Sequence, residues 1–143
     1  MRYYLDTNIL IFYLFAKEET NNLSSNVLGL FADYSNLFYT SSICIGELLH
    51  LYKSGNIVFR NLNLTNVQKI LDAIHEADIK IITTTEKHLI AFANLDIPYS
   101  DHKDPNDHMI IAQAISDKIP IISSDRKFKL YESQGLQFVF NKR

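Results

Sequence analysis

The chain has 143 residues and a mass of 16.5 kDa, with 14 Lys and Arg against 16 Asp and Glu and a formal net charge of −2. This length suits one compact domain, so we expect a single domain over 1–143. Because 47% of the residues are hydrophobic and 21% are charged, intrinsic disorder is excluded. The near-neutral charge excludes a protein that coats nucleic acid by bulk positive charge, but not an enzyme that cuts nucleic acid at one local site.

The composition also predicts a cytoplasmic protein. The single cysteine, Cys44, cannot form an internal disulfide, and no cysteine pair exists to hold a structural zinc. The longest apolar run, at 9–16, has eight residues, whereas a membrane span needs about 20. Asp6 and the polar segment at 17–20 are not typical of a signal peptide.

Short apolar runs alternate with amphipathic segments along the chain. In order, the first half predicts a strand at 2–5, a helix at 9–15 capped by Thr7 and Asn8, a helix near 27–31, a strand at 37–40 and a helix at 43–53 capped by Ser41 and Ser42. Residues 57–59 are either a short extension or part of a loop. The second half predicts a helix at 67–74 behind a capping-box pattern at 65–68, a strand at 79–83, helices at 86–94 and from Pro105 to 115, and strands at 119–123 and 136–140.

The order of these elements indicates the class of fold. Strands alternate with helices, and the strands are short and apolar throughout, which is typical of a parallel sheet covered by helices on both faces. In such α/β sheets ligands bind beyond the carboxyl ends of the strands. Side chains directly after predicted strands are therefore the candidate site residues.

Acidic side chains occupy several of these positions. They are Asp6 after the first strand, Glu47 one turn into the next helix, Asp107 in the first turn of the helix opened by Pro105, Asp125 after the strand at 119–123, and the nearby Asp104. Taken singly, most of these acids have an ordinary explanation: Asp6 suits a helix cap, Asp104 and Asp107 suit a capping box, and Asp125 suits a turn.

Glu47 is harder to explain in this way. Its neighbours Ile43, Cys44, Ile45 and Leu48 leave almost no polar face on the predicted helix, so this carboxylate should be partly buried and needs a cation or a donor. A lysine could compensate it. With other carboxylates at the same sheet edge, a divalent ion is the better explanation, and an all-oxygen donor set favours Mg²⁺ or Mn²⁺, one or two ions, over zinc. Such ions activate water and stabilise displacement at phosphorus, which implies a phosphate ester as substrate.

Basic and histidine side chains adjoin this acidic set. Five of the 14 basic residues lie between Arg126 and Arg143, against one acid. The candidates for contact with substrate phosphate are Arg126, Lys127, Lys129, His102 and His108. The formal net charge of −2 is therefore the sum of an acidic centre and a positively charged rim beside it.

Four segments resemble, in order and spacing, the motifs of PIN-domain ribonucleases, especially the VapC-like toxins of bacterial toxin–antitoxin pairs. They are Leu5-Asp6-Thr7-Asn8, SSICIGEL at 41–48, HKDPNDHMIIAQA at 102–114 and SSDRKFKLY at 123–131. No single motif is specific, but four in order over nearly the whole chain form a strong signal.

The resemblance implies a three-layer α/β/α sandwich with a central, mainly parallel sheet, and endonucleolytic cleavage of RNA with Mg²⁺ or Mn²⁺. Asp6, Glu47, Asp107 and Asp125 match the family's acidic quartet, Asp104 matches an additional acid, and Asn8 and Ser123 match polar residues that shape the site. Similar toxins form homodimers and are blocked by a small antitoxin protein. The chain departs from the pattern at Asn106 and His108, where many relatives carry an aromatic residue and an arginine.

Two other functions remain open from the sequence. A small phosphatase could use Asp6 as a nucleophile, although the second aspartate that such enzymes place two residues later is Asn8 here. A non-catalytic module could bind RNA or a protein through the same cleft.

Overall fold

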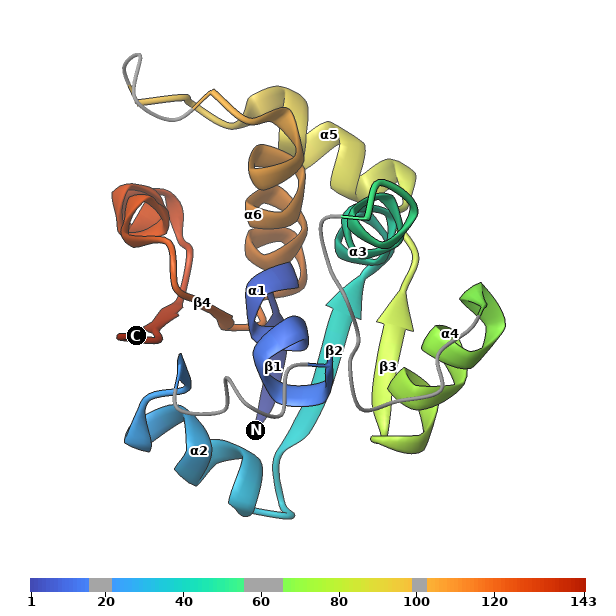
Figure 1. Cartoon of the computed structure of the whole chain (residues 1–143). Coiled ribbons are helices and arrows are strands. Elements are labelled where there is room, and N and C mark those ends of the chain that lie inside the picture. The colour runs from blue at the N-terminus through green and yellow to red at the C-terminus, as the bar shows by residue number, and fades with distance from the viewer. Residues whose placement is uncertain (16–21, 56–65, 99–102) are drawn as a thin grey trace.

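The computed structural model describes residues 1–15, 22–55, 66–98 and 103–143. Its centre is a five-stranded sheet in the order β3-β2-β1-β4-β5, in which every neighbouring pair is parallel. The strands are β1 (Arg2–Leu5), β2 (Leu37–Ser41), β3 (Ile79–Ile82), β4 (Ile121–Ser123) and β5 (Phe138–Phe140). In Figure 1 the arrowheads of β2 and β3 point toward the end of the sheet where α3 lies. The expected parallel α/β architecture is confirmed.

Helical segments connect the strands, as parallel pairing requires. They are α1 (Thr7–Leu10), the π-helical turn η1 (Ile11–Phe15), α2 (Ser25–Ala32), α3 (Ser42–Lys53), α4 (Val67–Glu76), α5 (Glu86–Asn94), α6 (Pro105–Asp117) and the 3₁₀ helix η3 (Arg126–Gln134). Among the described residues no helix is long and apolar enough to cross a membrane.

The side chains of the two central strands alternate between two helical layers. On one face Tyr3 stacks on Phe38 at 6.0 Å between ring centroids, and Phe38 in turn contacts Phe31 of α2 at 4.7 Å. On the other face the Tyr4 hydroxyl accepts a hydrogen bond from Gln113 of α6. Because adjacent residues of a strand point to opposite faces, α2 and α6 lie on opposite sides of the sheet, which gives the α/β/α sandwich.

Short polar side chains fix where the helices begin. Ser41 caps α3 by accepting a hydrogen bond from the Ile43 amide, Asn66 caps α4 through the Lys69 amide, and Asp104 caps α6 ahead of Pro105. The first helix differs from the prediction. Asp6, not Thr7 or Asn8, is its cap, and the helix starts two residues earlier than expected.

Other boundaries also differ from the sequence prediction. The strands expected from 119 and from 136 begin at Ile121 and Phe138, and the strand expected to reach 83 ends at Ile82. The short run at 57–59 and Thr65 of the capping-box pattern lie outside the described residues. The structure also contains η3, a helix that the sequence does not predict, and its Phe128 and Tyr131 are completely buried.

Candidate functional site

Asp6 lies at the carboxyl end of the central strand β1, with 6% of its surface exposed. One carboxylate oxygen, Oδ1, accepts a hydrogen bond from the Thr7 amide at 2.8 Å, and Oδ2 accepts one from the Ser123 hydroxyl at 2.6 Å. Ser123 ends the neighbouring strand β4, and its Oγ also accepts a hydrogen bond from the Asp125 amide at 3.0 Å. Asp6 is therefore a helix cap and, in addition, is tied directly to the adjacent strand.

The surroundings of Asp6 disfavour its negative charge. Burial and the charges of Asp107 and Asp125 raise the pKa of its carboxyl to about 6, against the hydrogen bonds from Ser123 and Thr7, which lower it. Asp107 and Asp125, which are distant from Asp6 in the sequence, are therefore near enough to Asp6 in the fold for their charges to affect it.

Glu47 lies on α3 and is half-buried, as the sequence predicts. Its Oε1 accepts a hydrogen bond from the Thr7 hydroxyl at 3.1 Å, so Thr7 joins Glu47 to the start of α1. Burial, followed by the charge of Asp6, raises the pKa of Glu47 to about 7, and the charges of Asp107 and Asp104 act in the same direction.

The remaining acids stand at helix starts. Asp104 caps α6 by accepting from the Asn106 amide at 2.9 Å, Asp107 lies in the first turn of α6, and Asp125 caps η3 by accepting from the Lys127 amide at 2.9 Å. The charge of each of these acids acts on Asp6, on Glu47 or on both. The structure thus places all five predicted acids in one electrostatically coupled group at this end of the sheet.

The oxygen donors of this group fit a hard divalent cation. Within the described part of the chain, no three His, Cys, Asp or Glu side chains lie close enough together to hold one ion. Mg²⁺ usually takes one or two protein carboxylates and completes its octahedral shell with water and substrate oxygens. One or two carboxylates of this group can therefore bind such an ion, with water and substrate oxygens as its remaining ligands.

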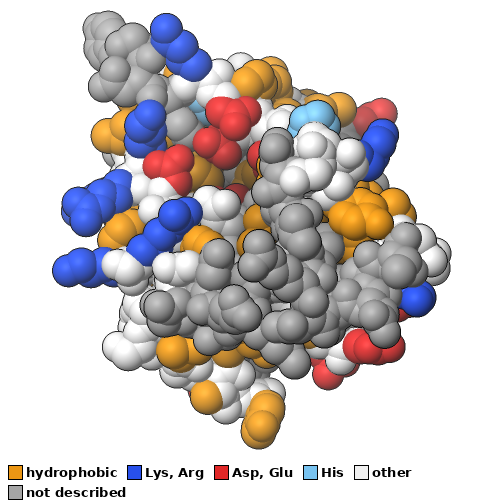
Figure 2. Space-filling model, in the orientation of Figure 1, with side chains coloured by type: hydrophobic (Ala, Val, Ile, Leu, Met, Phe, Trp, Pro, Cys, Tyr) orange, Lys and Arg blue, Asp and Glu red, His pale blue; other side chains and the backbone are white. Residues whose placement is uncertain are grey.

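A hollow of about 370 Å³ adjoins Glu47 between α3 and the start of α6, and its wall includes His50 and Asn106. Asn106 is one of the two positions where the chain departs from the family pattern, so this departure lies beside the acidic group. Figure 2 shows acidic side chains gathered on this face, with Lys and Arg side chains to one side of them.

The basic candidates begin η3, directly after Asp125. Arg126, Lys127 and Lys129 are exposed, and the guanidinium of Arg126 stands over the Phe140 ring at 5.3 Å. Their contact with substrate phosphate stays a prediction.

The other predicted site residues vary in exposure. Asn8 is half-buried in the first turn of α1, whereas His102 lies outside the described residues. His108 is 7% exposed, and its ring centroid lies 6.3 Å from that of Tyr131. Such burial suits a positioning role for His108 better than direct contact with substrate.

Two residues of this group were missed from the sequence. The sequence predicts Thr7 as a helix cap, whereas its hydroxyl links Glu47 to α1. Tyr131 is buried on η3, where burial and the charges of Asp107 and Asp125 raise the pKa of its hydroxyl. The three-residue spacing of Phe128 and Tyr131, together with Gly135 at the helix end, was the signal that could have found this helix.

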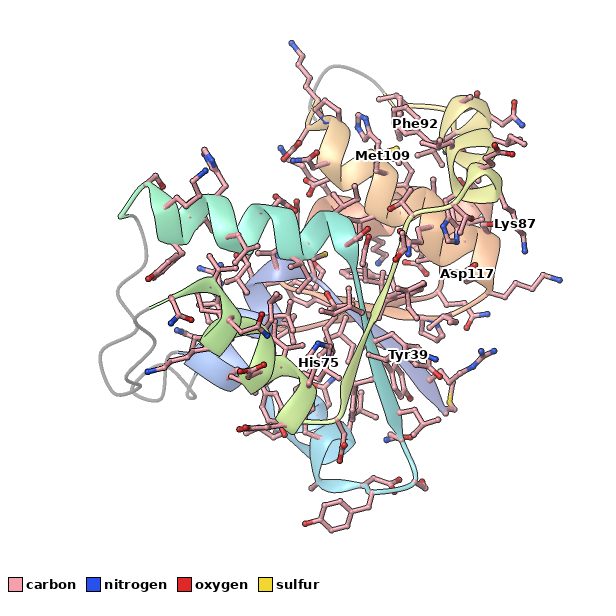
Figure 3. The ribbon with its side chains drawn as sticks, turned by 90° about the vertical axis from the view of Figure 1, so that its right-hand side faces the viewer. Tyr39, His75, Lys87, Phe92, Met109 and Asp117 are labelled. Carbon is pink, nitrogen blue, oxygen red and sulfur yellow. The ribbon has the colours of Figure 1, made fainter. Side chains whose placement is uncertain are left out.

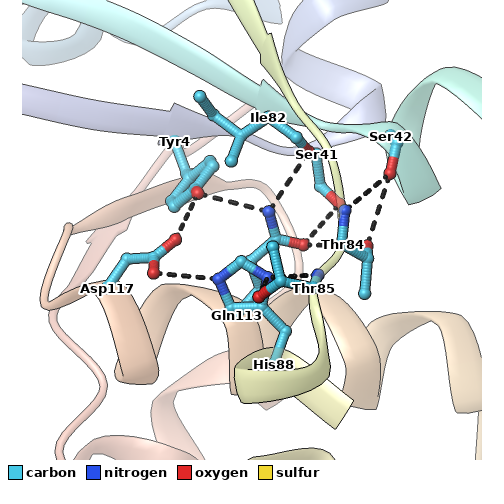
Figure 4. Close-up of polar contacts among 9 residues, drawn as sticks. All are labelled: Tyr4, Ser41, Ser42, Ile82, Thr84, Thr85, His88, Gln113 and Asp117. Carbon is cyan, nitrogen blue, oxygen red and sulfur yellow. Dashed lines mark hydrogen bonds and ion pairs between the residues drawn. The ribbon is translucent and has the colours of Figure 1, made fainter.

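A buried polar network packs behind this edge of the sheet (Figure 4). The Gln113 amide oxygen accepts from Ser41 at 2.8 Å and Thr84 at 3.2 Å, and its nitrogen donates to the Tyr4 hydroxyl at 3.2 Å and the Ile82 carbonyl at 3.3 Å. Since Ser41 caps α3 and Gln113 belongs to α6, one hydrogen bond joins the helices that carry Glu47 and Asp107.

The same network continues to a hydrogen-bonded pair, His88 and Asp117, that the sequence did not predict. The Asp117 carboxylate accepts a hydrogen bond from the Tyr4 hydroxyl at 2.6 Å, and its other oxygen lies 2.8 Å from Nε2 of the buried His88. His88 Nδ1 accepts from the Thr85 amide at 3.0 Å, completing the cap of α5. His88 therefore serves the packing of α5 on α6 and not the acidic group.

The comparisons with known proteins agree with this geometry. A family model described as the PIN domain matches residues 3–133. The chain belongs to the PIN-domain family. A comparison with curated proteins gives no match.

The fold of this PIN domain is similar to that of several solved structures. VapBC2 from Rickettsia felis, bound to a DNA fragment from its promoter, has a TM-score of 0.63 at 21% identity over 99% of this chain and 100% of that chain. VapBC-1 from nontypeable Haemophilus influenzae has a TM-score of 0.63 at 20% identity over 98% of both chains. DNA-bound VapBC from Salmonella typhimurium has a TM-score of 0.64 at 19% identity over 98% of both chains. The family resemblance predicted from the four motifs is confirmed, and the likeness extends across the whole fold.

Proposed function

We propose that this PIN-domain protein is a metal-dependent endoribonuclease that hydrolyses phosphodiester bonds in RNA. The observation that carries the proposal is the placement of Asp6. It is buried at the end of the central strand and bound to Ser123, and its ionisation is opposed by carboxylates from separate parts of the chain. A folded protein keeps such a costly arrangement where a ligand offsets it, which makes the cluster a candidate for catalysis.

Asp6, Glu47, Asp107 and Asp125 are the residues proposed to hold one or two Mg²⁺ or Mn²⁺ ions, with Asp104 beside them. Since no three of the described acids lie close enough together to hold the same ion, each ion would take at most two of these carboxylates directly and complete its shell with water and substrate oxygens. Bound there, a divalent ion would supply Lewis-acid activation of water and offset the charge of the phosphodiester. Each oxygen of Asp6 accepts one hydrogen bond and keeps a second lone pair for a cation.

The chain's own residues orient this centre. Ser123 and the Thr7 amide fix the carboxylate plane of Asp6, and the Thr7 hydroxyl fixes one oxygen of Glu47. Arg126, Lys127 and Lys129 at the start of η3 are exposed and follow Asp125 directly, which supports the proposal that they bind phosphates beside the scissile bond. Positive charge from the ions and from this rim supports RNA binding by a chain whose net charge is −2.

The biological role that fits best is that of the toxin in a bacterial toxin–antitoxin pair. Three structurally similar proteins are VapBC assemblies, two of them bound to DNA. By analogy, the proposed partners are a cognate antitoxin protein and a second copy of this chain. A short upstream reading frame that encodes a DNA-binding protein would support this role.

The test of the nuclease activity is Asp6→Asn, which keeps the size of the side chain and an acceptor for the Thr7 amide. The purified variant should cut a panel of RNAs at least about a hundredfold more slowly than the parent in Mg²⁺ or Mn²⁺, because even outer-shell changes at metal sites cost about 10–100-fold. EDTA should abolish the parent's cleavage.

The matched control is Asp72→Asn, which removes an exposed carboxylate on α4. It should cut RNA at the parent's rate. Equal cleavage by Asp6→Asn and the parent would refute the mechanism. Metal-independent RNA binding without cleavage of any RNA would favour a non-catalytic module.

A further inference from the structure

One face of the sheet is left open near the amino ends of its strands. Tyr4, Tyr39 and Lys80 are register partners across β1, β2 and β3, so their side chains share one face. This face packs against α6, which ends at Asp117, where the left-handed Lys118 turns the chain toward β4. Beyond that turn Tyr39 is half-buried and Lys80 exposed, and a hollow of about 490 Å³ lies over them.

Four cationic side chains line this hollow, which we call the basic basin: Arg2, Lys80, Lys87 and Lys118. Asp117 also lines it, but its two oxygens are engaged by the Tyr4 hydroxyl and by His88. In the described ranges, none of the four cations forms an ion pair with an acid. Figure 3 shows the labelled Lys87, Asp117 and Tyr39 one below another along this side of the molecule. The basin therefore concentrates positive charge in a chain of net charge −2.

The aromatic side chain of Tyr39 indicates the class of anion. Tyr39 lines the basic basin together with its register partner Lys80 and is half-buried. Cations beside an aromatic ring are a combination that binds nucleotides, with phosphates on the first and a base on the second. A second hollow of about 510 Å³ also touches Tyr39 and Lys80, but its rings Phe31 and Phe38 belong to the α2 face of the sheet and do not contribute to this site. The volume of the basin, about 490 Å³, falls in the range of about 300–1,000 Å³ that is typical of small-ligand sites.

We propose that the basic basin binds a phosphorylated nucleotide unit, with Lys80, Lys87, Lys118 and Arg2 contacting phosphate and Tyr39 next to the base. The unit is either a free nucleotide or one residue of an RNA strand, since both present the same chemistry. This site is separate from the acidic group, because Arg2 begins β1 and Asp6 follows its other end. The proposal goes beyond the nuclease function and does not depend on it.

The experiment measures binding of two probes, ADP and a 5′-phosphorylated hexaadenylate, to the full chain in EDTA, where metal-dependent cleavage does not occur. The test variant is Lys80→Gln with Lys87→Gln, and the matched control is Lys53→Gln with Lys69→Gln, which removes the same charge from exposed positions outside the basin. The basin variant should weaken binding by about tenfold or more and lower the salt dependence of hexaadenylate binding by about two phosphate contacts. The control should bind as the parent does.

The two probes separate the sources of the ligand. Basin-dependent binding of ADP would assign a free nucleotide, and basin-dependent binding of hexaadenylate alone would assign an RNA strand. In addition, Tyr39→Leu should weaken either probe by about tenfold while leaving pyrophosphate binding unchanged. Absence of binding, or equal losses in the basin and control variants, would overturn the proposal. Because cleavage is not measured, a failure here is distinct from a failure of the nuclease function.

Discussion

Replacing Asp6 with Asn should make the stability of the metal-free protein less dependent on pH. Burial and the charges of Asp107 and Asp125 raise the pKa of Asp6 from 3.8 to about 6. At about 1.4 kcal/mol for each pH unit, ionisation of Asp6 costs the folded protein about 3 kcal/mol relative to the unfolded chain. Asn cannot ionise, so the variant avoids this cost.

The direction of this pH dependence follows from which state, folded or unfolded, binds the Asp6 proton more tightly. The folded protein binds the Asp6 proton more tightly than the unfolded chain does, so the parent has this contribution in full below about pH 4 and loses it as the pH rises through about 6. Between about pH 4 and pH 8, the free energy of unfolding of Asp6→Asn should rise relative to that of the parent by up to about 3 kcal/mol. Removing the charge of Asp6 also lowers the pKa of Glu47, which adds to the gain.

Urea unfolding in EDTA at a series of pH values measures this difference. Asp72→Asn, at an exposed position on α4, is the control and should follow the parent at every pH. A difference between Asp6→Asn and the parent that stays constant with pH would refute the reasoning, since it would mean that Asp6 ionises as easily in the folded protein as in the unfolded chain. If Asp6 binds the metal as proposed, adding Mg²⁺ should raise the melting temperature of the parent more than that of Asp6→Asn.

Ser123→Ala should raise the pKa of Asp6 above about 6, because it removes a donor to the ionised carboxylate; a carboxyl NMR titration would check this, and an unchanged pKa would contradict it. Gln113→Leu should lower the free energy of unfolding by about 3 kcal/mol, since it leaves several buried partners unsatisfied, and a loss below about 1 kcal/mol would count against the network. Phe128→Ala should cost about 3–5 kcal/mol in urea unfolding, whereas Leu130→Ala, 48% exposed on the same helix, should cost far less.

Local patterns predicted most of the fold. The strand at 2–5 and the helix at 86–94 have the predicted bounds, because apolar strands and capping residues act over a few positions. The partial burial of Glu47 followed from its apolar neighbours alone. The places of Asp6 and Asp125 after parallel strands predicted that these two acids would lie at one edge of the sheet, since strand ends meet there. Asp104 and Asp107 follow helix α5 instead, so the rule does not account for their place beside Asp6.

The rest depends on contacts between distant parts of the chain. His88 and Asp117 are 29 positions apart and meet because α5 packs on α6, which no local pattern of either helix records. The basic basin combines side chains from three strands and two helices, so no single segment of the sequence shows its concentration of positive charge. The 3₁₀ helix η3 was not predicted because its segment is mostly polar, and the two aromatic side chains that pack it against the core are too few to form a clear apolar pattern.

The hydrogen bond between Asp6 and Ser123 spans 117 positions of the chain. During synthesis β1 emerges before its neighbour β4 and the cap Asp125, which lie far later in the chain. An incomplete chain has Asp6 without Ser123 beside it and without the sheet that buries it. If the protein cleaves RNA as proposed, the order of its strands delays that activity until β4 has been made, because a product of the gene that stops before Ser123 lacks the hydrogen bond that fixes Asp6.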